Sequence, residues 1–312
     1  MHFMKKIFAS IITIFLVSII IFFIFQIIPG DPILSKLGEN NDPALAAALR
    51  SEYGLDKPLV LRYFNWLGGL LQGNLGISIR YTIPVNNLIS ARLPITISLS
   101  VFSLILVVLF GIPLGILAAY LHNNGKGFIF NLLTQLGIAV PPFYVAMLLI
   151  LVFSIQLNLL PVSSYVSPSE NLVDFLSGML LPALAVSISS IAVTARYTRN
   201  SFLQELNENY VRTARASGIG QRKILYGYVL RNALVPVMTI LGLIIVSVLT
   251  GSMVIESVFS IPGIGSLLFE GIKGRDFPLV QGITFYISAI VVFGFLILDI
   301  LYGVIDPRIR VK

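Results

Sequence analysis

The feature that most constrains this chain is a series of six apolar runs, none of which contains a charged residue. About 20 apolar residues are enough to cross a bilayer as a helix. Because lipid offers the backbone no hydrogen-bonding partner, such runs must be helical. The sequence therefore predicts an all-α integral membrane protein with six transmembrane helices in a single transmembrane domain over 1–312. The runs cover 7–28, 97–121, 136–157, 175–195, 236–255 and 277–298.

The composition excludes several other classes of protein. The chain is 56% hydrophobic and 11% charged, whereas soluble domains contain about 25% charged residues. It has no cysteine, which excludes disulfides, thiolate metal sites and a cysteine nucleophile. The net charge is +7, and its cations lie in segments beside the apolar runs. That distribution is typical of membrane topology and not of a nucleic-acid-binding surface.

The first run is predicted to remain as an uncleaved span. It is too long for a signal peptide, and no small-residue cleavage site follows it. The next segment, 30–93, is predicted to be a folded extracytoplasmic loop. It contains Asp42 as a candidate helix N-cap and Gly54 just past the end of the same helix. Two further helices are expected at 58–71 and 84–91.

The positive charges predict the orientation of the chain. Outside the long loop, most lysines and arginines lie in 1–6, 122–127, 196–235 and 306–312. Short positive segments stay on the cytoplasmic side. Both termini are therefore predicted to be cytoplasmic, and the five later spans form a core over 97–305.

The most distinctive polar interval of that core is the cytoplasmic loop 205–235, between the fourth and fifth spans. Its cations are Arg212, Arg215, Arg222, Lys223 and Arg231. Two short helices are predicted there. The first ends just before Gly218, its C′ residue. The second runs from about 221 to 232, before Pro236 opens the next span.

This loop has two possible roles, attachment to anionic lipid and docking of a soluble partner. Charge alone fits lipid attachment. Small side chains at Ala214, Ala216, Ser217 and Gly218 add nothing to lipid binding but allow another chain to approach closely, so they favour docking. Apolar contacts to the partner are expected from Tyr210 and from Ile224 or Leu225.

Several motifs carry a resemblance to a known family. The run Arg212-Thr213-Ala214-Arg215-Ala216-Ser217-Gly218, followed by Arg231-Asn232-Ala233-Leu234-Val235-Pro236, resembles the "EAA" coupling loop of ABC-importer permeases, with Arg212, Thr213 and Ala214 in the Glu-Ala-Ala places. The chain is most similar to the B-type subunit of the dipeptide/oligopeptide/nickel permeases. Further matches are Pro29-Gly30-Asp31-Pro32, Tyr53-Gly54-Leu55-Asp56-Lys57-Pro58, Gly73-Asn74-Leu75-Gly76-Ile77-Ser78, Phe259-Ser260-Ile261-Pro262-Gly263-Ile264-Gly265 and Asp276-Phe277-Pro278-Leu279-Val280.

The resemblance implies a transporter subunit of the bacterial inner membrane. It implies a second, similar permease subunit in a heterodimer, two cytoplasmic ATPase subunits and an extracytoplasmic solute-binding protein. Cargo would be peptides or a related small solute such as a nickel chelate or a glutathione-like thiol. ATP and Mg²⁺ would be bound by the ATPases, so this chain needs no cofactor of its own. The implied ATPase-coupling residues are Arg212, Thr213, Ala214, Arg215, Ala216, Ser217, Gly218, Arg231 and Asn232.

Two acidic residues near the spans are candidates for a gate or an intramembrane charge. Glu256 ends the fifth span, where a gate and a plain interfacial charge are equally compatible with the sequence. Asp299 follows the uncharged run 277–298 within the sixth span, which is expected to end near Ile305. A charge within a span is a candidate functional group, but snorkelling towards water or pairing with a neighbouring helix explains Asp299 more simply. A stand-alone ion-coupled transporter would use such groups, but it would need several of them. Neither a phosphate-binding G-x-x-x-x-G-K-[S/T] nor an H-E-x-x-H motif occurs, which argues against an ATPase or a metal-dependent enzyme.

Overall fold

The computed structural model describes residues 2–28, 30–37, 42–121, 125–162 and 165–305. Its contacts divide the chain into two compact units. Unit 1 comprises Met1–Ile95 and Pro262–Lys312, and unit 2 comprises Thr96–Ile261. The elements of the described residues are helices, apart from one isolated bridge between Ile77 and Pro84. The predicted all-helical class is therefore confirmed.

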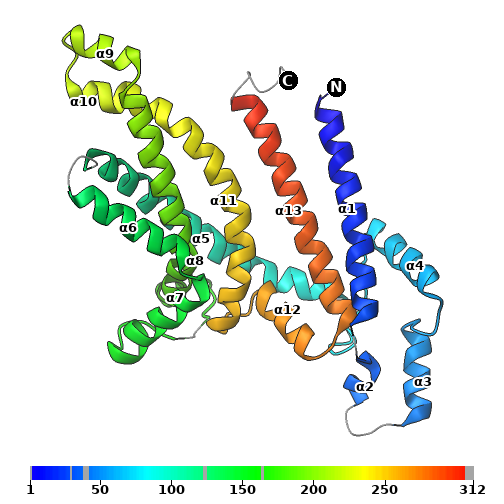
Figure 1. The fold of residues 1–312 in the computed structure, drawn as a ribbon. Helices are drawn as coiled ribbons and strands as arrows, with labels where there is room; N and C mark the ends of the chain where they lie inside the picture. Colours follow the sequence, from blue (N-terminus) through cyan, green and yellow to red (C-terminus); the bar gives the residue numbers. More distant parts are fainter. Residues whose placement is uncertain (1, 29, 38–41, 122–124, 163–164, 306–312) are drawn as a thin grey trace. The chain divides into compact units, whose positions relative to one another are not determined.

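Unit 1 is built around two long apolar helices. Helix α1 (His2–Ile27) and helix α13 (Phe277–Ile305) pack against each other, as Figure 1 shows. Helix α12 (Ile264–Lys273) packs on α13, and α4 (Leu59–Leu71) packs on α1. The short helices α2 (Pro32–Leu37) and α3 (Pro43–Glu52) pack together.

The segment after α1 follows its local sequence signals closely. The side chain of Asp42 accepts a hydrogen bond from the N–H of Ala44 at 2.9 Å, which caps α3. Gly54 follows α3 with a φ of +66°, where glycine costs nothing. Helix α4 matches the predicted helix 58–71. The predicted helix 84–91 is wrong as a separate element, because α5 (Val85–Tyr120) continues without a break.

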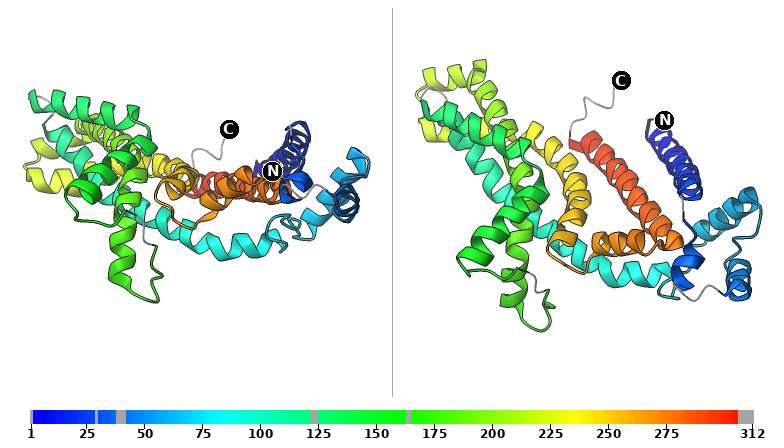
Figure 2. Two further views of the ribbon diagram at one scale, coloured as in Figure 1. Left: turned by 90° about the horizontal axis from the view of Figure 1, so that it is seen from below. Right: turned by 60° about the horizontal axis from the view of Figure 1, so that its bottom comes forward.

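Unit 2 has helix α8 (Leu172–Leu206) at its centre. It packs against α11 (Leu230–Val258), against α6 (Gly125–Ala139) and against α7 (Pro142–Leu149). Figures 1 and 2 show α8 running along α11. Helix α8 continues through Pro182 and carries Arg196 and Arg199 within its last three turns. The helix therefore continues past the predicted span 175–195, and the end of the span within it stays a prediction.

Glycines allow the part of α5 in unit 2 to approach α8 closely. A Cβ atom built on Gly111 would lie 2.8 Å from Cβ of Thr194. One built on Gly115 would lie 2.5 Å from Cβ of Thr198 and 2.6 Å from the carbonyl oxygen of Ala195. Gly111 and Gly115 are four residues apart and so share one face of the helix, as in the small-residue interfaces of membrane helices.

We expect Gly115→Ala to destabilise the protein by about 1–3 kcal/mol, the usual cost of overpacking a tight interface. The backbone carbonyl of Ala195 cannot rotate away from the added methyl group. Gly251→Ala in α11 is the matched control, since no atom in the described part of the chain lies within 4 Å of a Cβ atom there. Thermal unfolding in detergent should give a lower midpoint for Gly115→Ala alone; equal midpoints for both variants would argue against this contact.

Within the described residues, five helices are long and apolar enough to cross a membrane, or six if one bent pair is counted as a single span. The bent pair corresponds to the predicted third span, 136–157. Its two arms, Gly127–Ala139 and Pro142–Gln156, meet at 101°, so the predicted third span is not one continuous helix. Pro141 and Pro142 explain the break, because proline lacks the N–H donor and disfavours helical backbone in the residue before it. The second arm ends in a π-helical segment, η1 (Ile150–Gln156).

Candidate functional site

The predicted coupling segment begins with helix α9 (Asn209–Ala216), which ends at a well-formed glycine cap. Gly218 has a φ of +74°. Its N–H donates to the carbonyl of Arg215 at 3.0 Å, and the N–H of Ile219 donates to the carbonyl of Ala214 at 3.2 Å. These two bonds define the Schellman motif. The predicted C′ role of Gly218 is therefore confirmed.

A hydrophobic cluster fixes this capped helix to the rest of unit 2. Val211 and Ala214 on α9 are buried against Ala119 and Phe202 and against apolar residues of the following segment. Ile224 and Leu225 belong to this cluster and are 1% and 5% exposed. They do not face outward, so the expectation that one of them contacts a partner is wrong.

The opposite face of the segment is polar and accessible. Of the predicted coupling residues, Ala214 is buried, and the others are exposed: Arg212, Thr213, Arg215, Ala216, Ser217, Gly218, Arg231 and Asn232. Arg222 and Lys223 are also exposed. The structure thus places the segment's five cations on accessible surface, with small residues between them.

The second half of the segment is continuous with the fifth span. Helix α10 (Gln221–Lys223) passes into a π-helical segment, η2 (Ile224–Val229), and then directly into α11. Pro236 lies inside α11 and does not open a new element. The prediction of a second, separate helix is corrected accordingly. Figure 1 shows α9 and α10 at one end of α8 and α11. Helices α10, η2 and α11 follow one another without a loop, so a displacement of α10 would be transmitted to α11.

Two aromatic residues of this region were not predicted. Tyr226 is 62% exposed and Tyr228 is 42% exposed, both in η2. Their rings are exposed on the segment where the sequence analysis expected Ile224 or Leu225 to be accessible. Leu225, Val229 and Ala233 are buried at every fourth position, so the apolar stripe of this helix faces the cluster and the tyrosines lie off that stripe.

The structure describes the side chain of one of the two predicted intramembrane charges, Glu256. Glu256 lies in α11 and is fully buried. A plain interfacial charge would be in contact with solvent, so its burial favours an internal role over that alternative. Asp299 falls within α13, but its side chain lies outside the described residues.

A third acidic residue, Asp276, has a position that sequence reasoning missed. It is 1% exposed. Its carboxylate accepts hydrogen bonds from the hydroxyl of Ser78, from the N–H of Ile79 at 3.1 Å and from the N–H of Arg80 at 3.0 Å. It also accepts from the N–H of Leu279 at 3.3 Å, in the first turn of α13. One carboxylate therefore caps α13 and holds the 78–80 turn within unit 1.

The described side chains suggest no metal centre. Among them, no three His, Cys, Asp or Glu residues gather in a way that could hold a metal ion. The prediction that the chain binds no cofactor of its own is not tested by this and stays a prediction.

Comparison with known proteins shows the family. Residues 111–311 match the model of the binding-protein-dependent transport system inner membrane component, and residues 1–100 match the N-terminal model of the same membrane components. The dipeptide transport system permease protein DppB of Bacillus subtilis is 35% identical over 310 residues, which cover 99% of this chain and 97% of that protein.

Two further relatives extend the match over nearly the whole chain. A protein of Brucella ovis named as a peptide permease is 40% identical over 299 residues, 94% of each chain. A protein of Sinorhizobium fredii named as a peptide ABC transporter permease is 36% identical over 312 residues, 99% of each chain. Together with the five or six apolar helices, these matches establish that the chain belongs to the family of inner-membrane components of binding-protein-dependent transport systems and is a multi-pass membrane protein.

Proposed function

We propose that this chain is the permease subunit of an ATP-driven importer of peptides. Its family defines it as the membrane component of a binding-protein-dependent system, and the relatives named above are peptide or dipeptide permeases. The family assignment favours this function over a stand-alone ion-coupled transporter. A nickel chelate or a glutathione-like thiol is the alternative cargo.

The proposed mechanism depends on one observation: the coupling segment is exposed on one face and packed against α8 and α11 on the other. The exposed cations and small residues between Arg212 and Gly218 form the docking face, with Arg231 and Asn232 beside it. The cluster around Val211 and Ala214 makes α9 move with α8 and α11. ATP-driven closure of the ATPases would then displace α11 through η2. Two states of the spans, with different affinities for cargo, give alternating access.

The remaining partners follow from the same proposal. A binding-protein-dependent system implies ATPase and binding-protein partners. Two ATPase subunits would bind ATP and Mg²⁺ and dock on the coupling segment, which places that segment and both termini in the cytoplasm. The binding protein would then approach from the side of 30–93. A second permease subunit would complete the translocation path as a heterodimer. Glu256 and Asp299 are proposed as gate or intramembrane charges.

A gentle-detergent pull-down of the tagged chain, followed by mass spectrometry, tests this assembly. We expect an ATPase and a second permease to co-purify with the wild type. The double variant Arg212→Glu/Arg215→Glu should lose the ATPase and retain the second permease, because only the docking face changes sign. Lys273→Glu, an exposed cation of α12, is the control. A chain that purifies alone, under conditions that preserve other membrane complexes, would contradict the proposal.

Uptake measurements test the cargo. Membrane vesicles or cells containing the complete system should accumulate labelled dipeptide in an ATP-dependent manner. Competition by excess unlabelled dipeptide should abolish the signal, and competition by a nickel chelate should not. Competition by the nickel chelate and not by dipeptide would show that the alternative cargo is the substrate. The assignment of the chain as a permease subunit would not change.

A further inference from the structure

A pocket of about 360 Å³ lies within unit 1, between the end of α1, helix α4 and the first turns of α13. A second pocket of about 300 Å³ shares five residues with it: Gln26, Leu55, Arg62, Pro278 and Gln281. Pockets of this size hold small ligands or parts of larger ones. We propose that this paired pocket binds the phosphate of a membrane phospholipid headgroup, with Arg62 and Gln281 as its main donors.

Gln281 provides the first argument. Its side chain is 7% exposed and lines both pockets. The amide nitrogen Nε2 is buried and makes no hydrogen bond to any described residue. A buried donor without a partner costs about 1–3 kcal/mol and is rare in native structures. A bound acceptor in the pocket would satisfy it.

Arg62 provides the second argument. The charged residues of the first pocket are Glu52, Lys57 and Arg62, and those of the second are Asp31, Arg50 and Arg62. Each set has one more cation than anions. Asp31 already pairs with Arg50, and no described carboxylate pairs with Arg62. Burial alone lowers the pKa of Arg62. The surplus charge is therefore on a guanidinium, whose planar set of donors suits phosphate.

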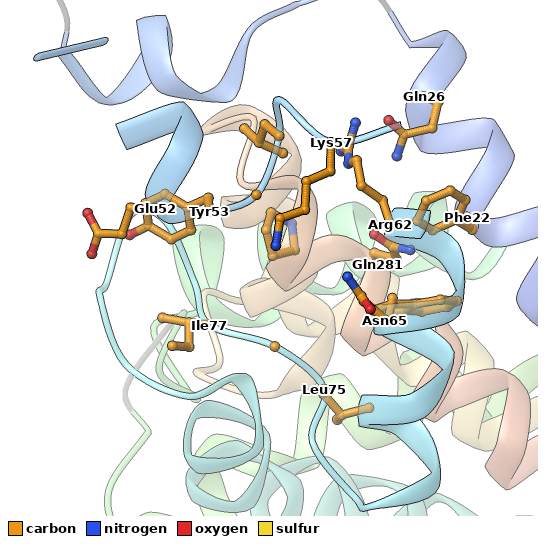
Figure 3. Close-up of a pocket in the computed structure, with 15 residues that line it drawn as sticks. Phe22, Gln26, Glu52, Tyr53, Lys57, Arg62, Asn65, Leu75, Ile77 and Gln281 are labelled. Atoms are coloured by element: carbon orange, nitrogen blue, oxygen red, sulfur yellow. The ribbon is translucent and has the colours of Figure 1, made fainter. Parts of the chain in front are cut away.

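Figure 3 shows Gln26, Arg62, Asn65 and Gln281 together on one side of the pocket, and Glu52 and Tyr53 on the other. The amides of Gln26 and Asn65 are additional donors for phosphate or glycerol oxygens. The only labelled carboxylate is thus on the far side from the donor group, where it does not repel a bound phosphate at Arg62.

The position of the pocket favours a lipid over a soluble anion. Gln26 lies at the end of the candidate span Met4–Ile27, and Gln281 lies at the beginning of the span Phe277–Leu298. The two donors are therefore at the level of the membrane interface. The rings of Phe22, Tyr63 and Trp66 pack together beside them, and aromatic side chains concentrate at this level.

Helix α4 adds a surface for the lipid tails. Val60 is 65% exposed and lies two residues before the pocket residue Arg62. Phe64 is 61% exposed and directly precedes the pocket residue Asn65. By helical spacing, Val60 and Phe64 share the face of α4 opposite Arg62. Helix α4 is therefore amphipathic, like helices that lie in the membrane interface with their apolar face towards the lipid tails.

Lipid binding to the full chain, purified with its co-purifying subunits and then delipidated, tests the proposal. Native mass spectrometry would measure the fraction bound with short-chain phosphatidylglycerol, with a diacylglycerol of the same chains and with inorganic phosphate. We expect phosphatidylglycerol to bind and diacylglycerol, which lacks the phosphate, to bind far less. Arg62→Gln should weaken phosphatidylglycerol binding about tenfold, as the loss of a charge-assisted hydrogen bond implies.

Two further variants separate binding from folding. Gln281→Leu removes the donor without leaving a buried polar group, so it should fold normally and still bind less lipid. Lys273→Gln removes an exposed cation that lines neither pocket and should bind lipid like the wild type. Equal binding by wild type and Arg62→Gln would overturn the proposal. Binding of inorganic phosphate as tight as that of phosphatidylglycerol would overturn the lipid as the ligand.

Discussion

Gly218→Val is expected to lower ATP-driven uptake about tenfold or more while the chain still reaches the membrane in normal amounts. Gly218 has a φ of +74°, in the left-handed region that costs an L-residue about 1–2 kcal/mol and a β-branched residue more. Each 1.4 kcal/mol is a factor of ten in an equilibrium. The strain would melt the Schellman cap, and with it the orientation of the docking face.

The loss of uptake in Gly218→Val should come from backbone strain and not from a steric clash of the new side chain with other residues. No atom of the described residues lies within 4 Å of a Cβ atom built on Gly218, and the same is true of Gly220. Gly220, however, has a φ of −60°, which any residue adopts. Gly220→Val is therefore a control for the bulk of the new side chain, two positions away on the same exposed segment.

Uptake and ATPase co-purification should be measured for both variants, with surface biotinylation or membrane fractionation to compare their amounts. We expect Gly218→Val to lose both properties and Gly220→Val to keep them. Normal uptake by Gly218→Val would show that the capped end of α9 is not part of the coupling surface. Loss of uptake in both variants would instead point to simple steric exclusion of the partner.

The cap at Gly218 illustrates which features a sequence reveals. A Schellman motif and an Asx N-cap such as Asp42 depend on residues within one turn of each other, so the local pattern contains all the information. The same holds for the apolar spans, because length and hydropathy alone decide whether a helix can cross a bilayer. The two caps are confirmed, and among the described residues five of the six predicted spans correspond to helices long and apolar enough to cross, while the third corresponds to the bent pair.

The features that were missed depend on geometry between turns or between distant segments. Ile224 and Leu225 are buried against Ala119, Phe202 and α9, which are distant in sequence, whereas Tyr226 is exposed. The prolines at 141 and 142 were visible, but the 101° between the two arms is set by how α6 and α7 each pack on α8. The Gly111 and Gly115 interface likewise needs Thr194 and Thr198 on the opposite helix.

Asp276 is the clearest example of a long-range feature, and its replacement should have the largest effect on stability. Its carboxylate and Ser78 are 198 positions apart, so no local pattern connects them. Asp276→Ala would leave the buried Ser78 hydroxyl and the N–H groups of Ile79 and Arg80 without their acceptor. Hydrogen bonds to a charged group contribute about 1.5–3 kcal/mol each but are not additive. We therefore expect a loss of roughly 3–5 kcal/mol for the whole cluster, the size seen when one partner of a buried polar network is removed.

Unfolding of Asp276→Ala should begin within unit 1. The 78–80 turn and the start of α13 would separate first, so limited proteolysis should cut near the turn in Asp276→Ala, and the thermal unfolding midpoint in detergent should fall. Asp56→Ala removes the same charge from an exposed position of the same unit and should leave both measurements unchanged. Asp276→Asn keeps one acceptor oxygen and should lie between wild type and Asp276→Ala. If Asp276→Ala unfolds like Asp56→Ala, the carboxylate does not hold these two segments together. Their attachment would then depend on the hydrophobic contacts among α12, α13 and the 75–85 segment, where Leu267, Leu279 and Val85 are buried.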